Sequence, residues 1–327
     1  MIQVQDLTKK YSRNLAVDHI SFQVQKGEIV GFLGPNGAGK TTTMRMLTCF
    51  LPPSAGTANV AGFDILEQPL EVKKRVGYLP ETPPLYLEME TVEYLQFVGK
   101  LKGLKGEELS KRVDYVCERC SITDVRTKLL GKLSKGYRQR VGLAQAIIHN
   151  PDVLILDEPT AGLDPKQINE TRDLIRSLAG DHTIILSTHI LPEVEQTCEK
   201  VVIISKGKLV ATDSVENLQA RARGVESMLV EVAGRNGNLD TATVRSRLER
   251  ISGVSRVSLK NTRDSLATFE VESQKGFVRG DLARAVVESG WDLNELRPSA
   301  MSLEEIFLQL TAQETENANP VAQGKTA

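Results

Sequence analysis

The chain has 327 residues, 40% of them hydrophobic, which is enough for about two domains with full-sized cores. Its 41 basic and 42 acidic residues give a net charge of −1, so no strong field of one sign points to nucleic acid or an anionic bilayer. Residues 1–6 form no basic or apolar leader, and no run approaches the ~18 apolar residues of a membrane span. We expect a cytoplasmic protein with no nucleic-acid partner, whose membrane role, if any, comes through another subunit.

The first 33 residues alternate strand-like runs with turns, over 2–4, 20–24 and 28–33. Their alternating polar and apolar residues predict an antiparallel edge to a larger sheet. Tyr11 stands between the first two runs. Taken alone, it fits an aromatic that stacks on an adenine face and a half-buried surface tyrosine equally well.

A phosphate-binding pattern follows. Residues 34–42 (GPNGAGKTT), here called the phosphate loop, fit G-x-x-x-x-G-K-[ST] between an apolar run and a helical one. Glycines let successive backbone N–H groups turn inward on a phosphate, and the helix start adds a positive dipole end. Lys40 can then reach the β- and γ-phosphates of a nucleotide, while the Thr41 hydroxyl ligates Mg²⁺. An accidental glycine-rich turn is the alternative, and the strand and helix context disfavours it. The nucleotide-binding residues expected here are Gly34, Asn36, Gly37, Ala38, Gly39, Lys40, Thr41 and Thr42.

Residues 57–61 and 75–79 read as short strands, and the character then changes. Helical spacing without intervening strands predicts a helical insertion over about 88–132. Cys117 and Cys120 fall inside it, where cysteine fits a small core residue better than half of a zinc site.

A second anion-binding pattern precedes an acidic strand. Residues 133–140 (LSKGYRQR), here called the signature loop, place a serine and a glycine before a helix expected over 141–149. The apolar run 153–156 then ends in Asp157 and Glu158, as in a buried parallel strand with acids at its carboxyl end. Asp157 is placed to bind Mg²⁺ and Glu158 to orient or deprotonate an attacking water. An ordinary helix cap and solvent-facing carboxylates are the simpler alternatives.

The next segments return the chain to the same sheet edge. Asp164 and Pro165 predict a helix that ends at Gly180. The apolar run 183–187 then delivers His189 to the edge where ligands bind in α/β sheets. Residues 201–211 predict a hairpin.

Together these motifs make residues 1–222 resemble the ATP-binding subunit of an ABC transporter. The phosphate loop, the signature loop, Asp157–Glu158, residues 161–164 and His189 occur in the family's order. The resemblance implies an α/β fold, a P-loop NTPase of ABC type with a mixed sheet, an antiparallel edge and the helical insertion. It also implies that Tyr11 stacks on adenine, with Val17 as a further nucleotide-binding residue.

The resemblance implies a mechanism as well. Two copies sandwich two ATP molecules, and Ser134 and Gly136 of one copy complete the γ-phosphate site built around Lys40 of the other. Lys40, Glu158 and His189 are the implied catalytic residues, with His189 contacting the γ-phosphate. Such a subunit is a motor on the inner face of the membrane that drives a separate transmembrane permease.

The sequence departs from the commonest family pattern at two places. Lys135 and Tyr137 stand where glycine and glutamine are usual. Glu81 stands where most members have a glutamine. The expected metal-site residues are therefore Glu81 together with Thr41 and Asp157. The segment 77–86 around Glu81 resembles the branch that serves ABC-2-type permeases, including drug exporters, and so implies export.

Residues 225–310 predict a second, α+β unit. Its runs follow the order β-α-β-β-α-β of the ferredoxin-like split motif and end in a helix over 303–310. It resembles an accessory domain that braces the ATPase, contacts a second copy or binds a regulator. The polar tail 311–327 is expected to be disordered.

Two other functions stay open from the sequence. A soluble ABC ATPase of translation or DNA repair would carry a second such domain or a long coiled coil, and this chain has neither. A nucleotide-binding regulatory module that does not turn over would be expected to have lost the acid at Glu158.

Overall fold

The computed structural model describes residues 1–299 except 13, 223–225, 235–238, 264 and 274–278. The chain forms two compact units, Met1–Val215 and Glu216–Ala327. The predicted helix 303–310 and the tail 311–327 lie outside the described residues.

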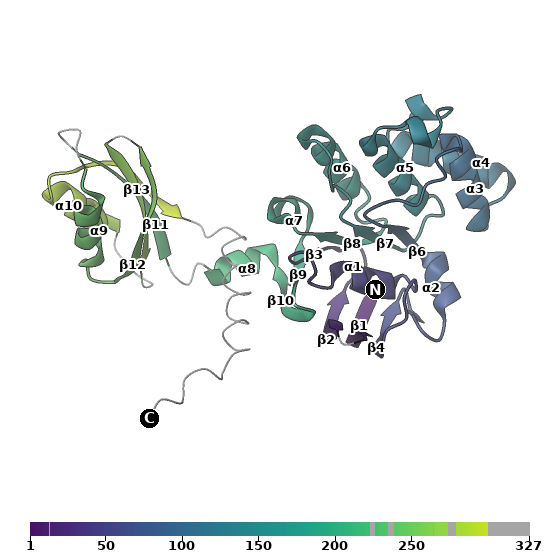
Figure 1. The fold of residues 1–327 in the computed structure, drawn as a ribbon, viewed down its shortest axis with the longest axis horizontal. Coiled ribbons are helices and arrows are strands. Elements are labelled where there is room, and N and C mark those ends of the chain that lie inside the picture. Colours follow the sequence, from purple (N-terminus) through teal and green to yellow (C-terminus); the bar gives the residue numbers. More distant parts are fainter. Residues whose placement is uncertain (13, 223–225, 235–238, 264, 274–278, 300–327) are drawn as a thin grey trace. The chain divides into compact units, whose positions relative to one another are not determined.

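A six-stranded mixed sheet forms the centre of the first unit (Figure 1). Its strands, in spatial order, are β10 (Lys208–Ser214), β9 (Lys200–Ser205), β3 (Ile29–Leu33), β8 (Thr183–Thr188), β7 (Val153–Asp157) and β6 (Val76–Leu79). Neighbouring strands are parallel except β10, which pairs antiparallel with β9. Strands β3, β7 and β8 are buried along their whole length, as expected of apolar strands covered on both faces. The predicted mixed sheet is confirmed, but its antiparallel edge is β10 and not the segment for which that edge was predicted.

The first two strands belong to a separate sheet, which corrects the expectation that residues 2–33 form one edge of the central sheet, since only the last of these runs, β3, joins that sheet. Strands β2 (Asn14–Val24), β1 (Ile2–Tyr11), β4 (Ala55–Val60) and β5 (Phe63–Asp64) make a separate antiparallel sheet. Its buried side chains share one core with the central sheet, where the rings of Phe22 and Phe32 lie 5.5 Å apart. Alternation shows that a strand has one buried face, but it does not show which strands pair.

Helices complete the first unit. They are α1 (Lys40–Leu47), α2 (Pro69–Arg75), α3 (Thr91–Leu101), α4 (Gly106–Arg119), α5 (Lys135–Ile147), α6 (Pro165–Ser177), α7 (Leu191–Thr197) and the 3₁₀ turns Thr123–Val125 and Leu130–Lys132. The predicted helical insertion is α3, α4 and the two turns, which lie beside α5 (Figure 1). Helix α5 begins at Lys135, six residues before the expected start, because Ser134 is its N-cap and accepts a hydrogen bond from Tyr137 N. Helix α6 ends at Ser177, before Gly180.

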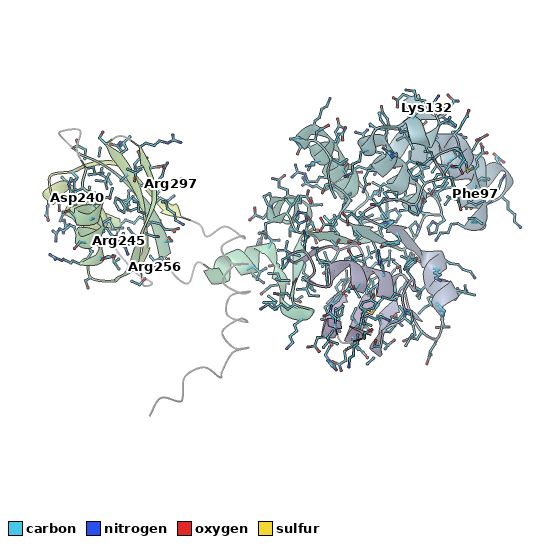
Figure 2. The ribbon with its side chains drawn as sticks, viewed as in Figure 1. Phe97, Lys132, Asp240, Arg245, Arg256 and Arg297 are labelled. Atoms are coloured by element: carbon cyan, nitrogen blue, oxygen red, sulfur yellow. The ribbon has the colours of Figure 1, made fainter. Side chains whose placement is uncertain are left out.

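The second unit has its own sheet and core. Its elements are α8 (Val215–Ala222), β11 (Glu226–Ala233), α9 (Thr241–Glu249), β12 (Val254–Arg263), β13 (Leu266–Ser273), α10 (Arg279–Glu288) and β14 (Asp292–Ser299). The spatial order β12-β13-β11-β14 with antiparallel neighbours is the predicted split motif, since each βαβ pair is separated by one strand of the other. Buried side chains such as Val230, Phe269 and Val286 fill its core. Arg245, Arg256 and Arg297 are exposed (Figure 2).

Candidate functional site

The phosphate loop connects β3 to α1, and its shape requires glycine at two positions. A Cβ on Gly34 would lie 2.4 Å from the carbonyl oxygen of Ile204. Gly39 has a φ of +107°, and a Cβ there would lie 2.5 Å from the Ala16 oxygen. Because both clashes are with backbone atoms, a side chain at either position would force the loop away from its neighbours.

The β9–β10 turn is hydrogen-bonded to the phosphate loop. Gly207 N donates to the Ala38 oxygen at 3.0 Å, and Asp18 N donates to the Gly207 oxygen at 2.8 Å. The loop is therefore held between β2 and the β9–β10 hairpin.

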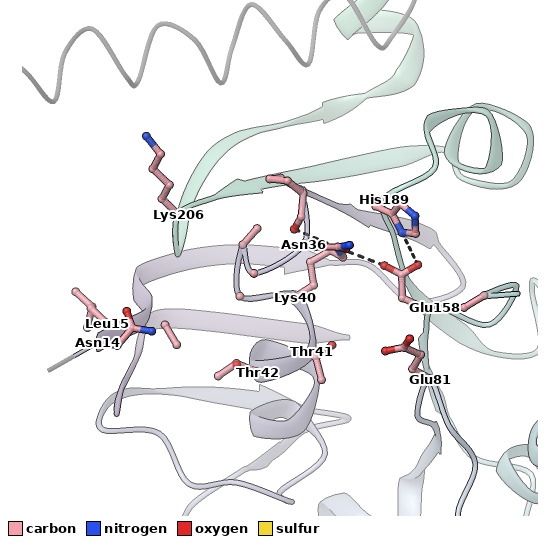
Figure 3. Close-up of a pocket in the computed structure, with 16 residues that line it drawn as sticks. Asn14, Leu15, Asn36, Lys40, Thr41, Thr42, Glu81, Glu158, His189 and Lys206 are labelled. Carbon is pink, nitrogen blue, oxygen red and sulfur yellow. Dashed lines mark hydrogen bonds and ion pairs between the residues drawn. The ribbon is translucent and has the colours of Figure 1, made fainter. Parts of the chain in front are cut away.

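A cavity of about 480 Å³ opens in front of the loop (Figure 3). Its lining residues are Asn14–Ala16, Pro35–Thr42, Glu81, Glu158, Ala161, His189 and Lys206. The lining combines loop amides, a helix N-terminus, two cationic residues and two carboxylates. Amides at a helix start are the standard donors for phosphate oxygens.

Lys40 is buried at the centre of this lining, with 6% of its surface exposed. Its ammonium donates to the carbonyl oxygens of Gly34 at 2.7 Å and Pro35 at 3.3 Å. It also lies 3.3 Å from Glu158 Oε1. The Lys40 charge thus has one anionic partner among the described residues, and that partner is the predicted catalytic base.

Glu158 joins Lys40 to His189. Its Oε2 lies 2.9 Å from His189 Nδ1, and Figure 3 shows both side chains converging on this carboxylate. The Glu158 side chain is 9% exposed and that of His189 is 45% exposed, so the histidine lies on the solvent side. The backbone of Glu158 is left-handed, with a φ of +49°, which costs a residue other than glycine about 1 kcal/mol or more. Its N–H donates to Ser187 O and Ser187 Oγ, both at 3.1 Å, and these bonds hold that conformation.

Asp157 has a buried oxygen available for a metal. The Ser187 hydroxyl donates to Asp157 Oδ1. Asp157 Oδ2 is buried and has no hydrogen-bond partner among the described residues. A carboxylate oxygen that accepts no hydrogen bond suits a hard cation such as Mg²⁺. Thr41, whose hydroxyl is the other predicted ligand, lines the cavity. Glu81 is exposed and also lines this cavity.

The cavity lining contains most of the predicted site residues, but six of them are not part of it. These six are Tyr11, Val17, Gly34, Ser134, Gly136 and Asp157. Tyr11 is 43% exposed, and the Lys9 ammonium lies over its ring, 5.4 Å from the ring centroid. Val17 is fully buried, with Cγ2 3.3 Å from a Cβ built on Gly39. Their contacts with nucleotide remain predictions.

Sequence reasoning missed several residues of the site. Asn14, Leu15 and Lys206 line the cavity, yet no sequence pattern marks them. Ser187 could have been found from the sequence, because it is the polar residue directly before Thr188–His189. In the structure it pairs in register with Asp157. Buried Glu193 on α7 is a further one, and it binds Thr160 and Thr188.

No helix in the described part of the chain is both long and apolar enough to cross a bilayer.

Comparisons with known proteins agree with this geometry. The family model described as ABC transporter matches residues 17–161. The bacitracin transport ATP-binding protein BcrA of Bacillus licheniformis is 35% identical over 320 residues, covering 95% of this chain and 97% of that protein. The daunorubicin resistance ATP-binding protein DrrA3 of Streptomyces coeruleorubidus is 33% identical and covers 95% of both chains.

A solved structure described as the ATP-binding subunit of an ABC transporter is similar in fold. It superposes with a TM-score of 0.62 at 29% identity, covering 68% of this chain and 92% of that one. Relatives that match nearly the full chain are transport and resistance subunits, which does not favour the soluble alternative. The chain belongs to the family of ABC transporter ATP-binding subunits and is an ATPase of that class.

Proposed function

We propose that this chain hydrolyses ATP with Lys40, Glu158 and His189, acts as a pair of copies and drives a separate membrane permease that exports its substrate. The observation that carries the proposal is the Lys40–Glu158–His189 cluster in front of the phosphate loop, in which Lys40 and Glu158 are buried and His189 faces solvent.

The first step is nucleotide binding. The triphosphate of ATP accepts hydrogen bonds from the phosphate-loop N–H groups, and the Lys40 ammonium exchanges its contact with Glu158 for phosphate oxygens. The exchange keeps the buried charge paired, since an unpaired charge at a site this enclosed is costly. ATP binding therefore frees Glu158 from its cation.

The second step is hydrolysis. A water oxygen bonds to the γ-phosphorus while the bond from that phosphorus to the ADP oxygen breaks, and Glu158 takes the water proton. His189 donates to a γ-phosphate oxygen, and Lys40 stabilises the charge that develops. The existing contact of Glu158 with His189 keeps both groups on the same side of the reacting phosphate.

Thr41 and Asp157, with Glu81 at the rim, would hold Mg²⁺ at this site, and the ion would neutralise the charge on the β- and γ-phosphates. Ser187 fixes the orientation of the Asp157 carboxylate, so the partnerless Oδ2 is the oxygen offered to the metal.

A second copy completes the site. Ser134 is exposed at the start of α5, away from the cavity of its own chain. In a sandwich of two copies it supplies a hydroxyl to the γ-phosphate held by the partner, and Gly136 lets the backbone approach closely.

The permease and the direction of transport rest on relatives. Two relatives that match 95% of this chain are named for bacitracin transport and daunorubicin resistance. We infer that the partner permease exports compounds of that kind.

Phosphate release from Mg-ATP tests the enzymatic part. The parent chain should turn over, while Glu158→Gln should bind ATP and lose about 10²-fold or more in kcat, as expected for removal of a general base. An Asp173→Asn control, at an exposed position of α6, should match the parent. A parent rate equal to that of Glu158→Gln would contradict the assignment of the base.

Drug accumulation in the host tests export. A chromosomal Glu158→Gln change should raise the retained amount of bacitracin or daunorubicin and lower the dose that stops growth. Unchanged retention of both compounds would contradict this class of substrate.

A further inference from the structure

Glu193 on α7 is a buried acid that the hydrolysis mechanism does not use. It is 2% exposed, and no cation partner is found for it among the described residues. Burying a carboxylate without a cation is costly unless its oxygens accept hydrogen bonds.

Each oxygen of Glu193 accepts one threonine hydroxyl. Oε1 accepts from Thr160 Oγ1 at 2.6 Å, and Oε2 accepts from Thr188 Oγ1 at 2.8 Å. Both threonines are buried, and Thr188 Oγ1 also accepts from Ile190 N at 3.0 Å. The contacts therefore use the full donor capacity of both hydroxyls.

The two threonines belong to the segments that carry the catalytic groups. Thr160 lies two residues after Glu158, and Thr188 lies directly before His189. The Glu193 carboxylate is hydrogen-bonded to both segments and so limits the movement of Glu158 relative to His189. Beyond Thr160 the same segment reaches the signature loop, since a Cβ on Gly162 would lie 2.1 Å from Lys135 Nζ.

We propose that Glu193 is a positioning residue that holds Glu158 and His189 in register for hydrolysis by bridging Thr160 and Thr188. The inference rests on the proposed roles of Glu158 and His189. Glu193 does not line the nucleotide cavity, so it acts only through the two threonines.

The mechanism predicts a split between turnover and binding. Glu193→Leu removes both acceptors and should lower kcat by about 10- to 100-fold, as small misplacements of catalytic groups do. The KM for ATP should change by less than about threefold, because Lys40 and the phosphate loop are untouched. Glu193→Gln should restore most of kcat, since its amide can accept from one threonine and donate to the other.

A matched control and a cycle separate positioning from folding. Glu195→Gln changes an exposed acid on the same helix and should match the parent. The pair Thr160→Val with Thr188→Val should lose kcat like Glu193→Leu, and adding Glu193→Leu to that pair should lower kcat no further. Thr160→Ser keeps the hydroxyl and should be active where Thr160→Val is not, so the threonine series decides the matter even if Glu193→Leu does not fold.

Two results would overturn the inference while leaving the proposed function intact. One is a Glu193→Leu enzyme whose kcat equals that of the parent. The other is full additivity of Glu193→Leu with the threonine pair. A parent chain that does not hydrolyse ATP would instead contradict the proposed function itself.

Discussion

The charge of Lys40 is the residue-scale feature that organises the site. It is buried, held by two carbonyl oxygens, and paired with a carboxylate that is itself bound to His189. Each of the three groups thus limits the positions of the other two. The same contacts make the lysine the obvious receiver of a phosphate anion.

Lys40→Ala should therefore weaken ATP binding by about 100-fold, because a charge-assisted hydrogen bond is worth about 1.5–3 kcal/mol. Titration with a fluorescent ATP analogue measures the change. Lys132→Ala removes an exposed lysine (Figure 2) and should bind like the parent. Equal affinity in Lys40→Ala and the parent would remove the lysine from the nucleotide site.

Glu81 brings a second negative charge to the cavity, where a glutamine would offer a neutral carbonyl. Both are oxygen ligands, so the exchange should preserve metal binding. The carboxylate repels the γ-phosphate unless a cation lies between them. Glu81→Gln should therefore stay an active ATPase and reach half-maximal rate at a lower Mg²⁺ concentration.

ATPase rates across a magnesium titration check this. Abolished hydrolysis in Glu81→Gln at saturating Mg²⁺ would give the carboxylate a catalytic role. Superimposed titrations would show that its charge has no effect on the site.

At the scale of elements, the sequence pattern predicted those features that depend only on residues close together in the chain. The phosphate loop, the acidic end of β7 and the strand before His189 follow from apolar runs ended by polar residues. The sequence did not reveal that Asn14 and Lys206 meet at one cavity, because that depends on how the β9–β10 turn packs on β2. It also missed α7 and with it Glu193, since its seven residues are too few to show periodicity.

His149, two residues after the end of α5, makes stability depend on pH. His149 Nε2 lies 3.2 Å from the Val76 oxygen, and burial together with the Lys102 charge lowers the pKa of His149 to about 3. The unfolded chain binds this proton near pH ~6.5 and the folded chain does not. Stability is therefore fully present above that pH and falls as the pH drops from ~6.5 towards 3.

His149→Gln keeps a donor for Val76 but does not titrate, so its free energy of unfolding should fall less steeply below pH ~6.5. Urea unfolding at a series of pH values measures the slope. Lys132→Ala, a change at an exposed residue other than histidine, serves as the control and should keep the parental slope. Parallel slopes for His149→Gln and the parent would show that burial does not suppress protonation of His149.

At the scale of the whole molecule, each unit has a hydrophobic core within its own residues. We therefore expect a chain that ends at Ala222 to fold and to bind ATP with parental affinity. Thermal unfolding and nucleotide titration of that truncation check this. Aggregation or lost binding would mean that the units depend on one another for stability.

The central claim is that two copies close on ATP and that Glu158 then acts as the general base for hydrolysis. Size-exclusion chromatography of Glu158→Gln with Mg-ATP tests it most directly, because ATP is bound while the water is not activated. We predict a dimer with Mg-ATP and a monomer without it, and a monomer in both cases for the double variant with Lys40→Ala. A Glu158→Gln chain that binds ATP and remains monomeric would contradict the account.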